Sequence, residues 1–106
     1  MEFKNYQEQA QKTAIYKDKL VYPALGLAGE AGEVSNKIKK ILRDSNGSLS
    51  DQTRESILQE LGDVLWYISA LCTDLGADLD KVASDNLQKL FTRKKNNSIS
   101  GEGDSR

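Results

Sequence analysis

The sequence contains no histidine at all. This absence excludes histidine general bases, Ser-His-Asp triads, imidazole zinc sites and the Glu-x-x-His di-iron bundle. The single cysteine, Cys72, cannot form an internal disulfide, and it lies in an apolar run where a buried, unreactive thiol is the usual outcome. Any chemistry must therefore come from carboxylates, lysines and hydroxyls.

Long apolar runs and a charge excess are also missing. The longest apolar run, from Val64 to Cys72, is far too short to span a bilayer, and the start MEFKNYQEQA lacks the apolar stretch of a signal peptide. A formal net charge of -1 gives no basic footprint for nucleic acid or anionic membranes. We therefore expect a cytoplasmic protein that binds neither nucleic acid nor a membrane.

A length of 106 residues is enough for one domain with one core. Helix formers and apolar periodicity predict helices over residues 2–17, from 23 or 24 to about 43, from a Ser48 or Ser50 cap to about 75, and over 79–95. Gly76 is expected to end the third helix in a left-handed cap, with Asp78 starting the fourth. We expect one helical domain over residues 1–95 and a polar tail over 96–106.

Apolar residues recur at steps of four and three in the second and third predicted helices, as in core-facing helices. They are Leu27, Ala31, Val34, Ile38 and Ile41, followed by Ile57, Leu61, Val64, Ile68, Leu71 and Leu75. The third helix has a second apolar line of Leu58, Leu65 and Cys72, which one small core cannot also bury. The pattern predicts an all-α protein of four helices that forms a homo-oligomer.

Acidic residues flank the two apolar stripes in pairs. Glu30 and Glu33 are three residues apart in the second helix, and Glu60 and Asp63 repeat this spacing in the third. If the stripes pack together, four carboxylates face one another, and a hard cation would relieve their repulsion. Oxygen ligands without histidine or thiolate favour Mg²⁺, with Mn²⁺ as a substitute.

One E-x-x-E motif alone usually marks a solvated helix face. Here two acidic pairs stand beside matching apolar lines and next to Gly29, Gly32 and Gly62, which favours a site. A catalytically silent helical interaction module, in which the acids only solubilise the bundle, is the alternative.

The segments GLAGEAGEVSNKIKK and ELGDVLWYISAL resemble the two motifs of the MazG-like, all-alpha nucleoside triphosphate pyrophosphohydrolases. The resemblance covers nearly the whole chain. It extends to Tyr6, Gln7 and Thr13, to Asn86, Lys89 and Arg93, and to the closing GEGDSR.

This resemblance implies an antiparallel four-helix bundle that assembles into a homodimer or homotetramer. It also implies a magnesium-dependent hydrolase that cleaves nucleoside triphosphates to the monophosphate and pyrophosphate. Glu30, Glu33, Glu60 and Asp63 would be the catalytic residues and metal ligands, and one of the glutamates would activate the attacking water. A related pyrophosphatase acting on a modified-nucleotide or non-nucleotide diphosphate is a second alternative. The resemblance also implies that the tail closes over a site.

The substrate contacts that we expect lie on three helices. Asn86, Lys89 and Arg93, at i, i+3 and i+7, form one polar face, which by spacing alone is typical of a solvated helix surface. The resemblance implies that this face contacts phosphate or base. Lys37 either neutralises phosphate charge or balances Glu33 one turn earlier.

Two neighbouring aromatic residues follow the second acidic motif. We count Tyr67 among the residues that bind the substrate, by stacking on a base. We assign Trp66 to the core or an interface, since a large aromatic beside an apolar stripe usually lies there.

Overall fold

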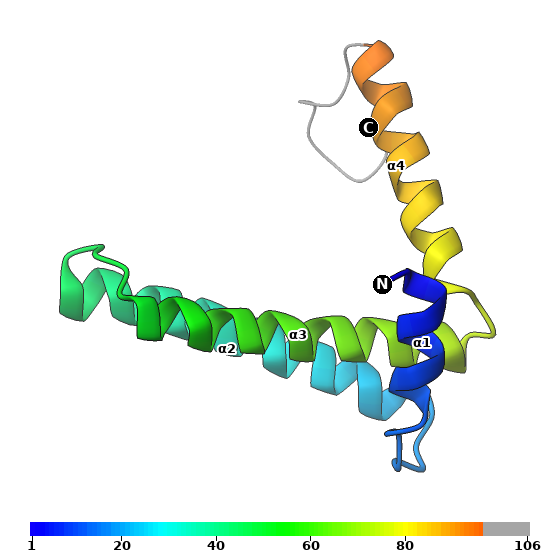
Figure 1. Cartoon of the computed structure of the whole chain (residues 1–106), viewed down its shortest axis with the longest axis horizontal. Coiled ribbons are helices and arrows are strands. Elements are labelled where there is room, and N and C mark those ends of the chain that lie inside the picture. The colour runs from blue at the N-terminus through cyan, green and yellow to red at the C-terminus, as the bar shows by residue number, and fades with distance from the viewer. Residues whose placement is uncertain (97–106) are drawn as a thin grey trace.

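The computed structural model describes residues 1–96, which form four helices and no strand. The helices are α1 (Phe3–Gln11), α2 (Val21–Ser45), α3 (Asp51–Asp74) and α4 (Leu79–Lys95) (Figure 1). The predicted all-α class is therefore confirmed for this part of the chain. Residues 97–106, which make up nearly all of the predicted tail, lie outside the described residues.

Helices α2 and α3 form a long antiparallel hairpin (Figure 1). The turn between them uses two left-handed residues, Asn46 at φ 53° and Gly47 at φ 81°. Ser50 then caps α3, because its side chain accepts a hydrogen bond of 3.1 Å from the backbone N–H of Thr53. The predicted Ser50 cap is confirmed, and Gly76 at φ 68° follows the end of α3 as expected.

Helix α1 is shorter than its composition predicts, since it ends at Gln11 rather than near residue 17. The segment between α1 and α2 instead binds to Asp74, the last residue of α3. The Tyr16 hydroxyl donates to both Asp74 carboxylate oxygens at 3.0 Å, and the backbone N–H of Leu20 donates to Oδ2 at 2.9 Å. These tertiary contacts outweigh local helix propensity, and α2 starts at Val21, slightly before the predicted position.

The buried core lies at the C-terminal end of α3, where α1 and α4 pack against it. Ser69 is 1% exposed, Ala70 and Leu79 are 4% exposed, and Cys72 is 6% exposed. The second apolar line of α3 is thus partly covered within the chain, at Cys72, whereas Leu58 near the hairpin tip is 43% exposed. Only the tip end of this line still needs another partner.

Gln7 ties α1 to the connection between α3 and α4. Its amide nitrogen donates to Thr73 Oγ1 at 3.1 Å and to the carbonyl of Ala77 at 3.0 Å. Its Oε1 accepts a hydrogen bond of 2.8 Å from the N–H of Leu79. Asp78 occupies the N-cap position of α4 as predicted, but its side chain makes no capping hydrogen bond, so Gln7 satisfies this helix start instead.

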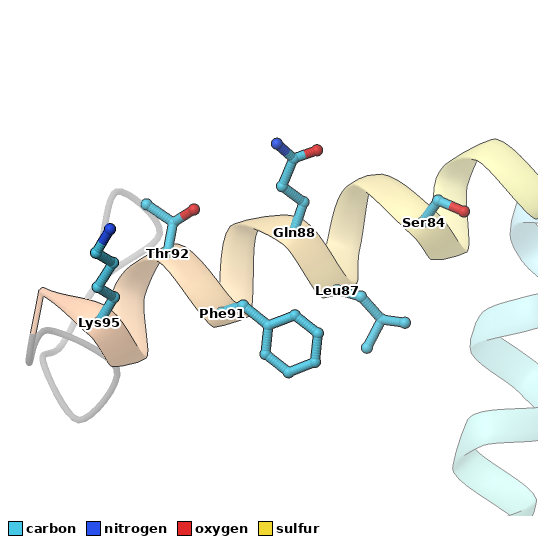
Figure 2. Close-up of a pocket in the computed structure, with 6 residues that line it drawn as sticks. All are labelled: Ser84, Leu87, Gln88, Phe91, Thr92 and Lys95. Atoms are coloured by element: carbon cyan, nitrogen blue, oxygen red, sulfur yellow. The ribbon is translucent and has the colours of Figure 1, made fainter.

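Helix α4 extends away from the hairpin beyond its first turns and makes no contact with α2 in the described part of the chain (Figure 1). Leu87 and Phe91 project from one side of it, and Gln88 and Thr92 from the other (Figure 2). Within residues 1–96, one chain does not close a four-helix bundle by itself. None of the helices in these residues is long and apolar enough to cross a membrane.

Candidate metal centre

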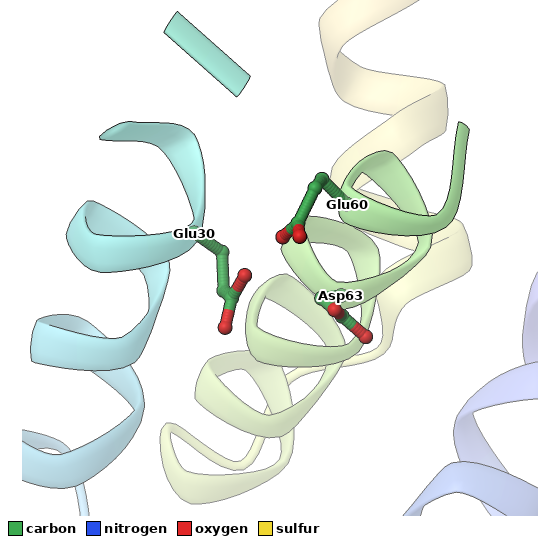
Figure 3. A group of neighbouring side chains, drawn as sticks. All are labelled: Glu30, Glu60 and Asp63. Atoms are coloured by element: carbon green, nitrogen blue, oxygen red, sulfur yellow. The ribbon is translucent and has the colours of Figure 1, made fainter. Parts of the chain in front are cut away.

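Three of the four predicted acids come together between α2 and α3. Each of Glu30, Glu60 and Asp63 offers a carboxylate oxygen, and these atoms lie within 4.8 Å of one another. Figure 3 shows Glu30 on α2 across from Glu60 and Asp63 on α3. Glu30 and Glu60 are half-buried and Asp63 is exposed.

The close approach of these groups changes the proton affinity of Glu30. The adjacent carboxyl group of Glu60, followed by loss of hydration and by the charges of Asp63 and Glu33, raises the pKa of Glu30 to about 7. Without a cation, these neighbours therefore favour the protonated form of Glu30.

The residues present fit a hard divalent cation. The donor set consists of carboxylate oxygens, which are the ligands that Mg²⁺ and Mn²⁺ prefer. In addition, Oε2 of Glu60 is buried and has no hydrogen-bond partner among the described residues. Because a buried carboxylate oxygen without a partner is unfavourable, this atom is suited to ligate a cation.

Glu33 lies outside the cluster of three, although its charge contributes to the raised pKa of Glu30. The hairpin register nevertheless sets it at the level of one of the three acids. Gly26 faces Tyr67, and Lys37, eleven residues further along α2, contacts Ser56, eleven residues back along α3. This constant register sets Glu33 at the level of Glu60, with its side chain exposed.

Lys37 contacts α3 rather than balancing Glu33. Its Nζ lies 3.7 Å from Oε1 of Glu60 and donates a hydrogen bond to Oγ of Ser56. The ion pair is partly shielded, with the Lys37 and Glu60 side chains 28% and 19% exposed. Lys37 therefore belongs to the surroundings of the acids, but through a partner that the sequence did not indicate.

A cavity of about 350 Å³ adjoins the acids. It is lined by Thr13, Glu30, Asp63, Trp66 and Tyr67. The indole N–H of Trp66 donates a hydrogen bond of 2.8 Å to Oγ1 of Thr13. The assignment of Trp66 to a core or interface therefore missed its place in the cavity wall, because only the fold brings the segment after α1 beside α3.

Tyr67 lies across α2 at Gly26. A Cβ atom at residue 26 would lie 2.2 Å from Cε1 of Tyr67, so only glycine admits the ring. By contrast, Cβ atoms at Gly29, Gly32 and Gly62 would meet nothing within 4 Å in the described chain. Of the glycines beside the acidic motifs, Gly26 alone is explained by packing within the chain.

Four aromatic rings connect the cavity to the start of α2. Tyr16 stacks on Tyr22 at 5.1 Å, Tyr22 lies 6.2 Å from Tyr67, and Tyr67 meets Trp66 edge-on at 5.1 Å. A hydrogen bond with Tyr22, and then loss of hydration, raise the pKa of Tyr67. Burial and the hydrogen bond to Asp74 raise the pKa of Tyr16 to about 12, so both phenols stay neutral at physiological pH.

Comparison with known proteins agrees with this arrangement. The family model described as the MazG nucleotide pyrophosphohydrolase domain matches residues 23–98. The chain belongs to this family. It is also 44% identical over 109 residues to the Gene 37 protein of Mycobacterium phage L5, covering 95% of this chain and 96% of that one. No solved structure matches the chain significantly.

The MazG match includes α4, whose polar face we expect to contact substrate. In the described chain α4 does not contact α2, and it leads away from the hairpin that carries the acids (Figure 1). Asn86 and Lys89 are exposed, whereas Arg93 is half-buried. The structure thus brings Tyr67 and Lys37 to the acids, but not these three α4 residues.

Proposed function

We propose that this MazG-family protein hydrolyses nucleoside triphosphates, ribo or deoxy, to the monophosphate and pyrophosphate. The observation that carries the proposal is the meeting of Glu30, Glu60 and Asp63 within 4.8 Å, at the acidic positions of the two motifs. Acids that only solubilise a helix surface are expected to point apart into solvent. Here they approach one another, and Oε2 of Glu60 is buried without a hydrogen-bond partner in the described chain. This arrangement supports a catalytic site over a silent interaction module.

The proposed cofactor is Mg²⁺, with Mn²⁺ as a substitute. Glu30, Glu60 and Asp63 would hold it, and we include Glu33 as the fourth ligand because the hairpin register sets it at the level of Glu60. When bound, the cation supplies neutralisation of the charge that develops on the phosphates. One of the glutamates accepts the proton of the attacking water, as general bases do.

The cavity beside the acids is where we place the nucleoside. Trp66 and Tyr67 offer aromatic surface there, next to Glu30 and Asp63. Since Tyr67 is a neutral phenol, it can also donate a hydrogen bond without adding charge. The triphosphate would then lie along the acids between α2 and α3.

We also propose a homo-oligomer, a dimer or tetramer. Large apolar side chains are strongly exposed on α2 and α4, such as Leu25 at 69%, Leu42 at 68% and Phe91 at 65%. Association of copies would bury part of this apolar surface.

Such an assembly also gives the polar face of α4 a role. Because α4 leads away from its own acids, it can approach the acids of another copy instead. Asn86, Lys89 and Arg93 would then contact a substrate held by a neighbouring subunit.

A substrate screen tests the reaction. Ribo- and deoxynucleoside triphosphates are incubated with the full chain and Mg²⁺, and the products are resolved by phosphorus NMR. We expect a monophosphate and pyrophosphate. A diphosphate and inorganic phosphate would contradict the assigned reaction, and hydrolysis of only modified or non-nucleotide diphosphates would favour the second alternative.

A further inference from the structure

Lys37 is fixed between the two helices of the hairpin. It reaches from α2 to α3, where it donates a hydrogen bond to Ser56 and lies 3.7 Å from Oε1 of Glu60. Ser56 precedes Glu60 by four residues, one helical turn, so both are on the same face of α3. The ammonium group of Lys37 is thus held beside the Glu60 carboxylate by two contacts, the hydrogen bond to Ser56 and the ion pair with Glu60.

The two oxygens of Glu60 differ in their surroundings. Oε1 faces the ammonium group of Lys37, whereas Oε2 is buried without a hydrogen-bond partner in residues 1–96. Lys37 thus pairs with Oε1 of Glu60 and makes no hydrogen bond with Oε2. A cation that took Oε2 would not need to displace the lysine.

We propose that Lys37 is a positioning residue, anchored by Ser56, which holds Glu60 through Oε1 so that Oε2 is presented to the cation. This inference rests on the metal site of the proposed function, and adds to it a residue that acts through a ligand. Groups that hydrogen-bond or pair with a ligating carboxylate fix its orientation, and their loss weakens metal binding.

The sign of the effect separates positioning from simple charge. A lysine that acted only by its positive charge would repel a cation, so removing the charge would tighten metal binding. A lysine that positions Glu60 has the opposite effect, because its removal lets the carboxylate leave the productive orientation. A lysine that contacts phosphate would instead change the Michaelis constant.

The first measurement is Mn²⁺ binding to the full chain without nucleotide, by electron paramagnetic resonance. In Lys37→Met, which keeps much of the apolar stem, we expect Mn²⁺ to bind about tenfold more weakly. Ser56→Ala keeps the charge but removes the anchor, so it should weaken binding in the same direction by less. Lys40→Met is the control, because Lys40 lines the same cavity of about 400 Å³ as Lys37 and Ser56 but forms no ion pair with Glu60 in the described chain.

The second measurement is steady-state kinetics with saturating Mg²⁺. Lys37→Met should lower kcat with little change in KM, whereas loss of a phosphate contact would raise KM. Equal or tighter Mn²⁺ binding in Lys37→Met, or a rise in KM with unchanged kcat, would overturn the proposal. Circular dichroism in EDTA checks the fold, and if Lys37→Met does not fold, Ser56→Ala decides by the same criteria.

The outcome for the parent protein separates this inference from the proposed function. If the parent binds no Mn²⁺, the metal site itself is wrong and the positioning role is wrong with it. If the parent binds Mn²⁺ and both variants bind it equally well, the metal site stands and only the role of Lys37 is refuted.

Discussion

Magnesium binding should release a measurable fraction of a proton from Glu30. Its pKa of about 7 means that the metal-free site is half protonated at pH 7. A carboxylate must be deprotonated to ligate a cation. The expected release is therefore on the order of half a proton per site near pH 7, more at pH 6 and less at pH 8.

Isothermal titration calorimetry measures this release. Titrating Mg²⁺ in buffers with different ionisation enthalpies gives an apparent binding enthalpy whose slope is the number of protons released. Glu30→Gln has no proton to release at this position, so its slope should vanish wherever binding can still be detected. Clear Mg²⁺ binding with no buffer dependence at pH 6 or 7 would refute the raised pKa of Glu30.

The same group predicts how the stability of the metal-free protein depends on pH. The pKa of Glu30 is raised from 4.5 to about 7, so the folded state binds more protons than the unfolded state between these values. The destabilising effect of ionising Glu30 is therefore absent below pH 4.5, grows as the pH rises, and is complete above about pH 7. In EDTA, Glu30→Gln should remove this decline in melting temperature between pH 5 and 8.

Three further predictions concern packing and assembly. Gln7→Ala removes the acceptor for the first N–H of α4, so thermal unfolding should show a loss of about 1–3 kcal/mol, and an unchanged melting temperature would show that this contact is dispensable. Gly26→Ala forces the ring over α2 to move and should lower both stability and turnover, whereas Gly29→Ala, with open space at its Cβ, should gain about 1 kcal/mol from helix propensity. The opposite order would contradict the packing at Gly26. Leu42→Glu places a charge on the exposed apolar tip, so light scattering should show a smaller mass than the parent's oligomer, and a monomeric parent would remove the argument for assembly.

Much of the fold could be predicted because its signals are local. The Ser50 cap, the left-handed Gly76 and the spacing of apolar residues gave four helices with nearly correct bounds. The end of α1 was wrong because Asp74 binds the chain after Gln11, at a sequence distance that no propensity reports. The direction of α4 could not be predicted either, since it depends on where Gln7 satisfies the start of that helix.

The candidate site, like the fold, could be predicted from local spacing only in part. Spacing of three residues predicts that Glu30 and Glu33 share a helix face, as Glu60 and Asp63 do, but not which of them meet across the hairpin. That depends on the register between α2 and α3, which Gly26 and its aromatic partner help to fix. The sequence also could not predict that Thr13 lines the cavity beside the acids.

The exposed apolar surface and the acidic cluster have a common origin in the hairpin. Two helices bury only the line along which they meet, and here that line carries Glu30, Glu60 and the lysine paired with Glu60. Polar groups on this line replace some apolar contacts, which lowers the stability that the hairpin gains from burial. The junction with α1 and α4 adds buried surface at the end of α3, and the proposed association through faces such as Leu42 and the proposed cation would stabilise the hairpin further, because both would bind only the folded state.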